Sequence, residues 1–100
     1  MADQVKQEIA SADCVFFDAP GCPFCRQAEA AMKSAGIPFK KVDIDGPGIG
    51  RAAIKAVCGK TSAPAVFIKG VYVGGCNDGT ESWHGVMPML KSGKFQEMLK

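Results

Sequence analysis

The segment Cys22-Pro-Phe-Cys25 stands between a short apolar run and a helical pattern. The run Cys14–Phe17 contains no charged residue, which is typical of a strand buried on both faces. Downstream, Cys25, Ala28 and Met32 recur at helical spacing, and a proline occupies the position that suits the first helical residue. The chain must therefore form an α/β arrangement with two cysteines, one helical turn apart, at a helix N-terminus.

The rest of the chain alternates between helical and strand-like patterns. Helical spacing predicts further helices at about 5–12, 51–57, 88–91 and 94–99. Strand-like runs cover 39–44, 65–68 and 71–73, and the last two are joined by the two-residue turn Lys69-Gly70. The strand–helix–strand order near the start implies parallel pairing by a right-handed crossover. We therefore predict a mixed four-stranded sheet flanked by helices on both faces.

Length and composition limit the class of protein. One hundred residues suit a single domain, 1–100, and 47% hydrophobic residues argue against wholesale disorder. A net charge of +2 is too small to drive binding to nucleic acid or to acidic membranes. The apolar runs are too short to cross a bilayer, and the N-terminal segment lacks an export or import pattern. We expect a soluble, cytoplasmic, monomeric protein.

Five cysteines are an odd number, and without a secretory context a disulfide framework is not expected. Cys22 falls at a helix start, where unpaired amides and the helix dipole favour a thiolate. Cys25 returns one turn later within reach of a reversible disulfide. Zinc is the alternative, because Cys58 and Cys76 could complete a four-cysteine set, and a coincidental pair also stays open.

The second feature is the proline before the strand at 65–68. A cis Ala63–Pro64 bond would turn the chain sharply and leave the Ala63 backbone free to pair with an extended thiol ligand. Most X-Pro bonds are trans, so the sequence by itself favours an ordinary trans proline that opens a strand.

The third feature is the run Gly74-Gly-Cys-Asn-Asp-Gly79. Paired glycines allow close backbone approach, and successive amides that lead toward a helix can form a nest for a carboxylate. Asp78 could bind an ammonium group of the same ligand. A simple turn with an Asx cap is the structural alternative.

Together, residues 22–25, the Ser62-Ala-Pro64 segment and residues 74–78 resemble the dithiol glutaredoxins, a branch of the thioredoxin-like fold. The resemblance implies glutathione-dependent reduction of protein–glutathione mixed disulfides and protein disulfides. It also implies a role in electron transport and cell redox homeostasis. Glutathione or a related low-molecular-weight thiol would be the co-substrate. Cys22 would be the nucleophile and Cys25 the resolving cysteine.

The resemblance also assigns a thiol-binding site. Pro64 matches the family's cis-proline, and the preceding Ala63 would pair with the glutathione backbone. The γ-glutamyl end would be held by Cys76, Asn77 and Asp78. A guanidinium at Arg51 would suit the glycine carboxylate.

Three departures from the family pattern affect this site. Ala19, preceded by Asp18, stands where the family usually has a cation, so that Arg26, Lys60 or the helix dipole must serve. Ser62-Ala63 replaces a commoner Thr-Val, which predicts a smaller pocket wall. The segment Gly79–Lys91 is longer than usual, which suggests a larger or unusual thiol partner.

Two other functions are alternatives to this one. Cys22 from two subunits and two thiol cofactors could hold a [2Fe–2S] cluster, although Pro23 and Cys25 argue against it. A thioredoxin-type disulfide reductase is disfavoured by the Pro-Phe dipeptide and by residues 74–78.

We expect the remaining cysteines and the histidine to serve mainly in packing. Cys14 and Cys58 are predicted to be small core residues, and His84 to be a surface or packing residue. Cys76 is either structural or an accessory oxidisable thiol.

Overall fold

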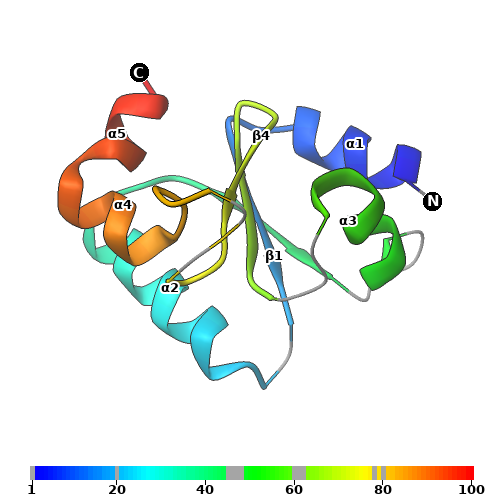
Figure 1. Ribbon diagram of the computed structural model, residues 1–100, viewed down its shortest axis with the longest axis horizontal. Helices are drawn as coiled ribbons and strands as arrows, with labels where there is room; N and C mark the ends of the chain where they lie inside the picture. The colour runs from blue at the N-terminus through cyan, green and yellow to red at the C-terminus, as the bar shows by residue number, and fades with distance from the viewer. Residues whose placement is uncertain (1, 20, 45–48, 60–62, 78, 80) are drawn as a thin grey trace.

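The computed structural model describes residues 2–19, 21–44, 49–59, 63–77, 79 and 81–100. Five helices and four strands succeed one another in this part of the chain (Figure 1). The helices are α1 (Ala2–Ala10), α2 (Pro23–Ser34), α3 (Gly50–Cys58), α4 (Val86–Ser92) and α5 (Lys94–Met98). The strands are β1 (Cys14–Asp18), β2 (Lys40–Asp43), β3 (Ala65–Ile68) and β4 (Val71–Gly74).

The four strands form one mixed sheet in the order β2-β1-β3-β4. β1 pairs in parallel with β2, with Phe17 opposite Val42. β1 pairs antiparallel with β3, with Phe16 opposite Val66, and β3 pairs antiparallel with β4. The predicted mixed four-stranded sheet is confirmed, and β2 lies at an edge, where Lys40 and Lys41 are exposed.

The turn between β3 and β4 follows from the sequence Lys69-Gly70. Both residues have positive φ, 50° and 84°. Two consecutive positive φ values give a turn whose twist matches that of the strands it joins, and glycine adopts this conformation without steric cost.

Helices cover both faces of the sheet. α1 and α3 lie together on one side, whereas α2, α4 and α5 lie on the other (Figure 1). Neighbouring strand residues point to opposite faces, so that Phe16 and Phe17 enter different layers of the core. Both side chains are fully buried. The double cover explains why β1 is a continuous apolar run rather than an alternating one.

The predicted elements differ from the structure mainly at their ends. α4 begins at Val86, two residues before the predicted start at Pro88. Proline is tolerated there because Pro88 lies in the first turn, where an amide has no partner within the helix. None of the helices in the described part of the chain is long and apolar enough to span a membrane.

Candidate active site

The two cysteines lie where β1 passes into α2. Cys22 has extended backbone angles, φ −85° and ψ 115°, and is the N-cap of α2, with Pro23 as the first helical residue. The Cys25 amide donates a hydrogen bond to Cys22 Sγ at 3.3 Å. The Cys22 sulfur therefore receives one of the amides that a helix leaves unpaired at its N-terminus, a position that stabilises negative charge.

Cys22 and Cys25 are both thiols, and their environments differ. Cys22 is half-buried, whereas Cys25 is fully buried. Burial raises the pKa of the Cys25 thiol to about 12, and the hydrogen bond to Cys22 and the charges of Cys22 and Asp18 act in the same direction. Cys25 therefore keeps its proton at neutral pH, so that Cys22 is the thiol of the pair that can react with an external disulfide.

The loop before β3 brings a second segment to Cys22. The Ala63–Pro64 peptide bond is cis, as the family resemblance implied and contrary to the trans bond that the sequence by itself favoured. The Cys22 thiol donates to the Ala63 carbonyl oxygen, with 3.8 Å between sulfur and oxygen. The carbonyl is thus in contact with the thiol rather than free, and Ala63 forms one wall beside the sulfur. Ser62 lies outside the described residues.

The third segment approaches α2 from β4. Gly75 and Cys76 are buried, and the Cys76 thiol donates to Gln27 Oε1 on α2 at 3.9 Å. Burial raises the pKa of Cys76, and the nearby charge of Cys22 acts in the same direction. Both findings favour a structural thiol over a reactive one. Asn77 is exposed beside it, and Asp78 lies outside the described residues.

Arg51 is exposed near the start of α3, which lies on the opposite face of the sheet from α2 (Figure 1). Its assignment to a carboxylate stays a prediction. The expected replacement cation Arg26 is exposed and lines a hollow of about 450 Å³ together with Asp18, Ala19 and Gly21. Lys60 lies outside the described residues.

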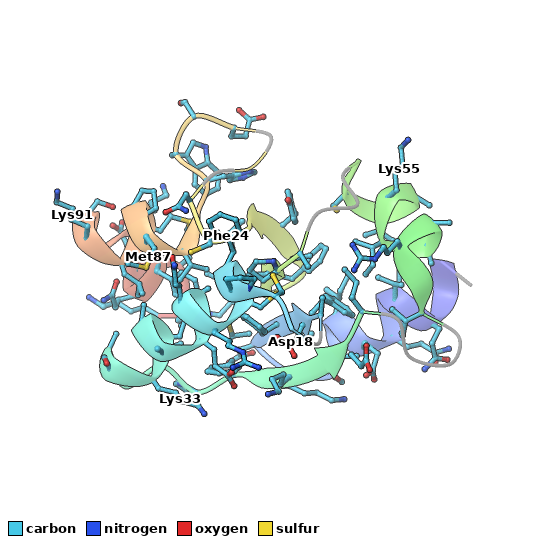
Figure 2. All side chains as sticks on the ribbon, turned by 90° about the horizontal axis from the view of Figure 1, so that it is seen from below. Asp18, Phe24, Lys33, Lys55, Met87 and Lys91 are labelled. Atoms are coloured by element: carbon cyan, nitrogen blue, oxygen red, sulfur yellow. The ribbon has the colours of Figure 1, made fainter. Side chains whose placement is uncertain are left out.

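Two exposed apolar side chains lie on α2 and on the neighbouring helix α4 (Figure 2). Phe24, in the Cys-x-x-Cys segment, is 54% exposed, and Met87 on α4 is 41% exposed. Figure 2 shows Phe24 near the start of α2 and Met87 on the neighbouring helix α4. Apolar surface next to a reactive thiol can contact a protein that presents its disulfide there.

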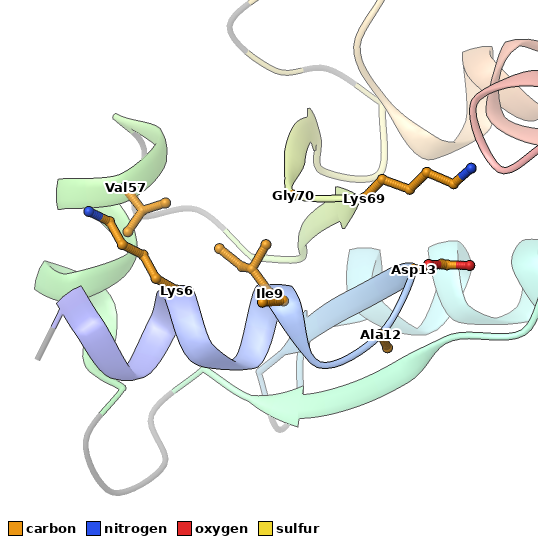
Figure 3. Close-up of a pocket in the computed structure, with 8 residues that line it drawn as sticks. Lys6, Ile9, Ala12, Asp13, Val57, Lys69 and Gly70 are labelled. Carbon is orange, nitrogen blue, oxygen red and sulfur yellow. The ribbon is translucent and has the colours of Figure 1, made fainter.

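A separate cavity of about 490 Å³ lies among α1, α3 and the turn between β3 and β4, lined in part by Ile9, Val57 and Lys69 (Figure 3). It also includes Asp13, which precedes β1, whereas Cys22 follows the other end of that strand. The cavity is therefore at the far end of the sheet from the cysteine pair and contributes nothing to that site.

The other residues singled out in the sequence have packing roles. Cys14 is buried, and burial raises its pKa to about 12. Cys58 is partly buried against the core, and His84 is buried. Within the described ranges, no group of three or more His, Cys, Asp or Glu side chains could hold a metal ion.

Sequence reasoning missed two contacts of this site. It did not foresee Gln27 as the partner of Cys76, or the backbone pairing of residues 85–87 with residues 73–76. The helical spacing that placed Cys25 on α2 also places position 27 near its N-terminus, but no local pattern joins it to a loop 49 residues away.

A thiol pair at a helix N-terminus that faces a cis-proline, on a mixed four-stranded sheet between helices, defines the thioredoxin-like thiol-disulfide oxidoreductases. The family model "Glutaredoxin" matches residues 14–73. Glutaredoxin 3 of Escherichia coli (strain K12) is 35% identical over 72 residues, which cover 70% of this chain and 87% of that protein. The chain belongs to the glutaredoxin family, and it is a thiol-disulfide oxidoreductase.

Solved structures agree in fold. A buckwheat glutaredoxin–glutathione complex has a TM-score of 0.83 and 26% identity, over 98% of this chain and 86% of the other. A wheat glutaredoxin has a TM-score of 0.82 and 31% identity, over 98% and 90% of the two chains. The predicted thioredoxin-like fold is confirmed.

Proposed function

We propose that this protein uses glutathione to reduce protein–glutathione mixed disulfides and protein disulfides, with Cys22 as nucleophile and Cys25 as resolving thiol. The main support for this proposal is the position of Cys22 Sγ, which lies 3.3 Å from the Cys25 amide nitrogen and 3.8 Å from the Ala63 carbonyl oxygen. The amide stabilises a thiolate. Because Ala63 covers one side of the Cys22 sulfur, a disulfide approaches from the uncovered side.

In the first step the Cys22 thiolate attacks the glutathione sulfur of the mixed disulfide. A bond forms between Cys22 Sγ and that sulfur, and the bond to the protein sulfur breaks. The protein leaves as a thiolate and takes a proton from water. The substrate cysteine is reduced, and Cys22 is oxidised to a mixed disulfide with glutathione.

In the second step the thiolate of another glutathione attacks the glutathione sulfur bound to Cys22. Glutathione disulfide leaves, and Cys22 returns as a thiolate. The proton lost by the second glutathione balances the one gained by the substrate thiol. One glutathione is consumed for each substrate disulfide, and Cys25 takes no part.

Protein disulfides require Cys25. After Cys22 has attacked, Cys25 displaces the second substrate thiol and closes a Cys22–Cys25 disulfide, which two glutathione molecules then reduce. A pKa of about 12 makes the Cys25 thiolate scarce at neutral pH. Once Cys22 is in a mixed disulfide, its hydrogen bond and its charge no longer raise the pKa of Cys25, which favours attack by Cys25 at this stage.

The proposed thiol-binding site consists of Ala63 and Pro64 on one side of Cys22 and of the segment that carries Cys76 and Asn77. Asp78 is proposed for the ammonium group of the ligand and Arg51 for its glycine carboxylate. Support comes from the contact between Ala63 and Cys22, and from the contact of Cys76 with α2 at Gln27. The buckwheat relative was solved as a glutathione complex.

The test is glutathione-coupled reduction of a glutathionylated peptide by the wild type, Cys22→Ser and Cys25→Ser. Cys58→Ser serves as the control, because it changes a cysteine at the end of α3. We expect Cys22→Ser to lose activity, and Cys25→Ser to keep it while failing to reduce protein disulfides. Wild type that is inactive with glutathione contradicts the proposal, and visible absorbance lost in air would then point to the [2Fe–2S] alternative.

A further inference from the structure

The segment that carries Cys76, part of the proposed thiol-binding site, is held by backbone hydrogen bonds from a later segment of the chain. The amides of Gly85, Val86 and Met87 donate to the carbonyls of Val73, Gly75 and Cys76, each at 2.8 Å. β4 is an edge strand, and the chain beyond it returns along its outer side toward α4 (Figure 1). The segment that carries Cys76 and leads to Asn77 is therefore fixed by residues about ten positions later in the chain.

His84 comes directly before this pairing and is 4% exposed, the one buried polar or charged residue in the described ranges. Its Nδ1 accepts a hydrogen bond from the Glu81 amide at 3.1 Å, and its own amide donates to the Glu81 carbonyl at 3.1 Å. The imidazole therefore closes the turn that leads into residues 85–87, with Nδ1 as the acceptor.

The imidazole also joins β4 to this turn. Its ring lies edge-on to Tyr72 of β4, with 5.4 Å between ring centroids and 85° between planes. The imidazole also lies edge-on to the Trp83 ring, with 4.3 Å between ring centroids and 77° between planes. The Lys94 ammonium lies 5.2 Å from the centre of the Trp83 ring. Aromatic contacts of this geometry add stabilisation beyond the area they bury.

Gly79 shows how closely the loop is held against His84. A Cβ at residue 79 would lie 2.5 Å from His84 Cβ, 2.6 Å from His84 Nδ1 and 2.9 Å from Gly74 Cα. Such distances are too short for any side chain, so the backbone at 79 is wedged between His84 and Gly74. The loop that contains Asn77 is thus held at residues 75–76 by backbone pairing and at Gly79 by His84.

We propose that His84 is a positioning residue for the thiol co-substrate, acting through Gly79 and residues 85–87 to fix the loop that bears Asn77. The inference rests on the proposed function of that loop. It also assigns a purpose to the longer Gly79–Lys91 segment, which contains both Trp83 and His84. The imidazole contacts Glu81, Tyr72 and Trp83, so that through the loop it sets affinity for the thiol rather than the reactivity of Cys22.

The experiment measures KM and kcat for glutathione in the wild type, His84→Leu, His84→Asn and Gly79→Ala. His84→Leu and Gly79→Ala should raise KM by about tenfold at nearly unchanged kcat, because loss of one well-placed buried interaction corresponds to about that factor. His84→Asn keeps an acceptor near the Nδ1 position and should restore part of the affinity. This split between KM and kcat is not expected of a merely structural residue.

Gly59→Ala is the matched control for general loss of stability. Gly59 caps α3 with φ 85° and has open space around it, so alanine there strains the backbone without touching the loop. Its KM should equal that of the wild type. If folded His84→Leu and Gly79→Ala also keep the wild-type KM, the positioning role is wrong while the proposed function stands. Wild type that is inactive with glutathione instead refutes the proposed function.

A measurement on the native histidine covers the case in which the loop variants do not fold. S-methylglutathione, which cannot exchange its sulfur, is titrated into Cys22→Ser while the His84 ring resonances and the Trp83 fluorescence are followed. As the ligand concentration rises, both signals should change along the same saturation curve, which gives one dissociation constant. Saturation of the site with no response from His84 overturns the proposal.

Discussion

The amide nitrogen of Cys25 lies 3.3 Å from the sulfur of Cys22, so that the backbone of the proposed resolving cysteine donates to the proposed nucleophile. The side chain of Cys25 has the opposite environment, since burial raises the pKa of its thiol to about 12. A single residue thus donates to the Cys22 sulfur through its amide while its own sulfur keeps its proton. This asymmetry separates the two cysteines chemically, although they are only three positions apart.

The first prediction is selective alkylation of the native protein. At pH 8 a thiol with a pKa of about 12 is a thiolate in about 10⁻⁴ of molecules, so iodoacetamide should modify Cys22 well before Cys25. Cys14, with a raised pKa of about 12, should be equally protected. Peptide mass spectrometry after timed labelling measures the order, and labelling in denaturant should make the five cysteines equivalent. Early labelling of Cys25 would contradict this assignment.

The second prediction concerns Cys22 as a helix cap. Serine can accept the Cys25 amide hydrogen bond in its place, whereas alanine cannot. Cys22→Ala should therefore lower the free energy of unfolding by about 1 kcal/mol relative to Cys22→Ser. Urea denaturation of the two variants measures the difference, and neither can react as a thiol. Equal stabilities would show that the bond to Cys22 does not hold the start of α2.

The strands and the main helices could be predicted because their information is local. Cys14–Phe17 had to be a strand covered on both faces, and Lys69-Gly70 had to be a tight turn, from residue type and spacing alone. The start of α4 was less clear, because Pro88 can be the first residue of a helix or belong to its first turn.

The site could be predicted where the chemistry is contiguous in sequence, as in residues 22–25. The cis bond before Pro64 could be expected only from the family resemblance and not from the local sequence, because the energies of the two isomers differ little and the surrounding fold decides between them. The contacts of His84 with the loop could not be predicted from the sequence either. Its imidazole meets Tyr72 and Gly79 only after β4 has joined the sheet and the chain has turned back, and no local pattern signals that contact.

The third prediction concerns the aromatic contact across β1 and β3. Phe17 and Phe67 meet edge to face, with ring centroids 5.7 Å apart, and both are buried. Phe67→Leu should lower the free energy of unfolding by about 1–2 kcal/mol, because it removes the ring contact and leaves a cavity. Val71→Ala, at a side chain that is 48% exposed, should change it by less than about 0.5 kcal/mol. Urea denaturation compares the two, and similar losses would refute the assigned core.

The fourth prediction is a stability contribution that disappears in acid. Glu29 is partly desolvated, which opposes its ionisation, but Lys41 at 3.3 Å and Lys33 at 3.5 Å together lower the pKa of its carboxyl below 4.5. A carboxyl whose pKa is lower in the folded than in the unfolded state stabilises the fold above the unfolded pKa. That contribution is lost as the pH falls through the folded pKa.

Glu29→Gln should therefore lower the free energy of unfolding at pH 7 by about 0.5 kcal/mol, because both lysines are exposed and water screens much of the interaction. The difference from wild type should shrink as the pH falls below 4.5 and vanish once the pH is below the lowered pKa of the folded state, where both side chains are neutral. Urea denaturation across this range measures it, with the exposed Glu97→Gln as control. A difference that persists at low pH would mean that Glu29 stabilises α2 through packing, and that its charge pairs with Lys41 and Lys33 contribute nothing.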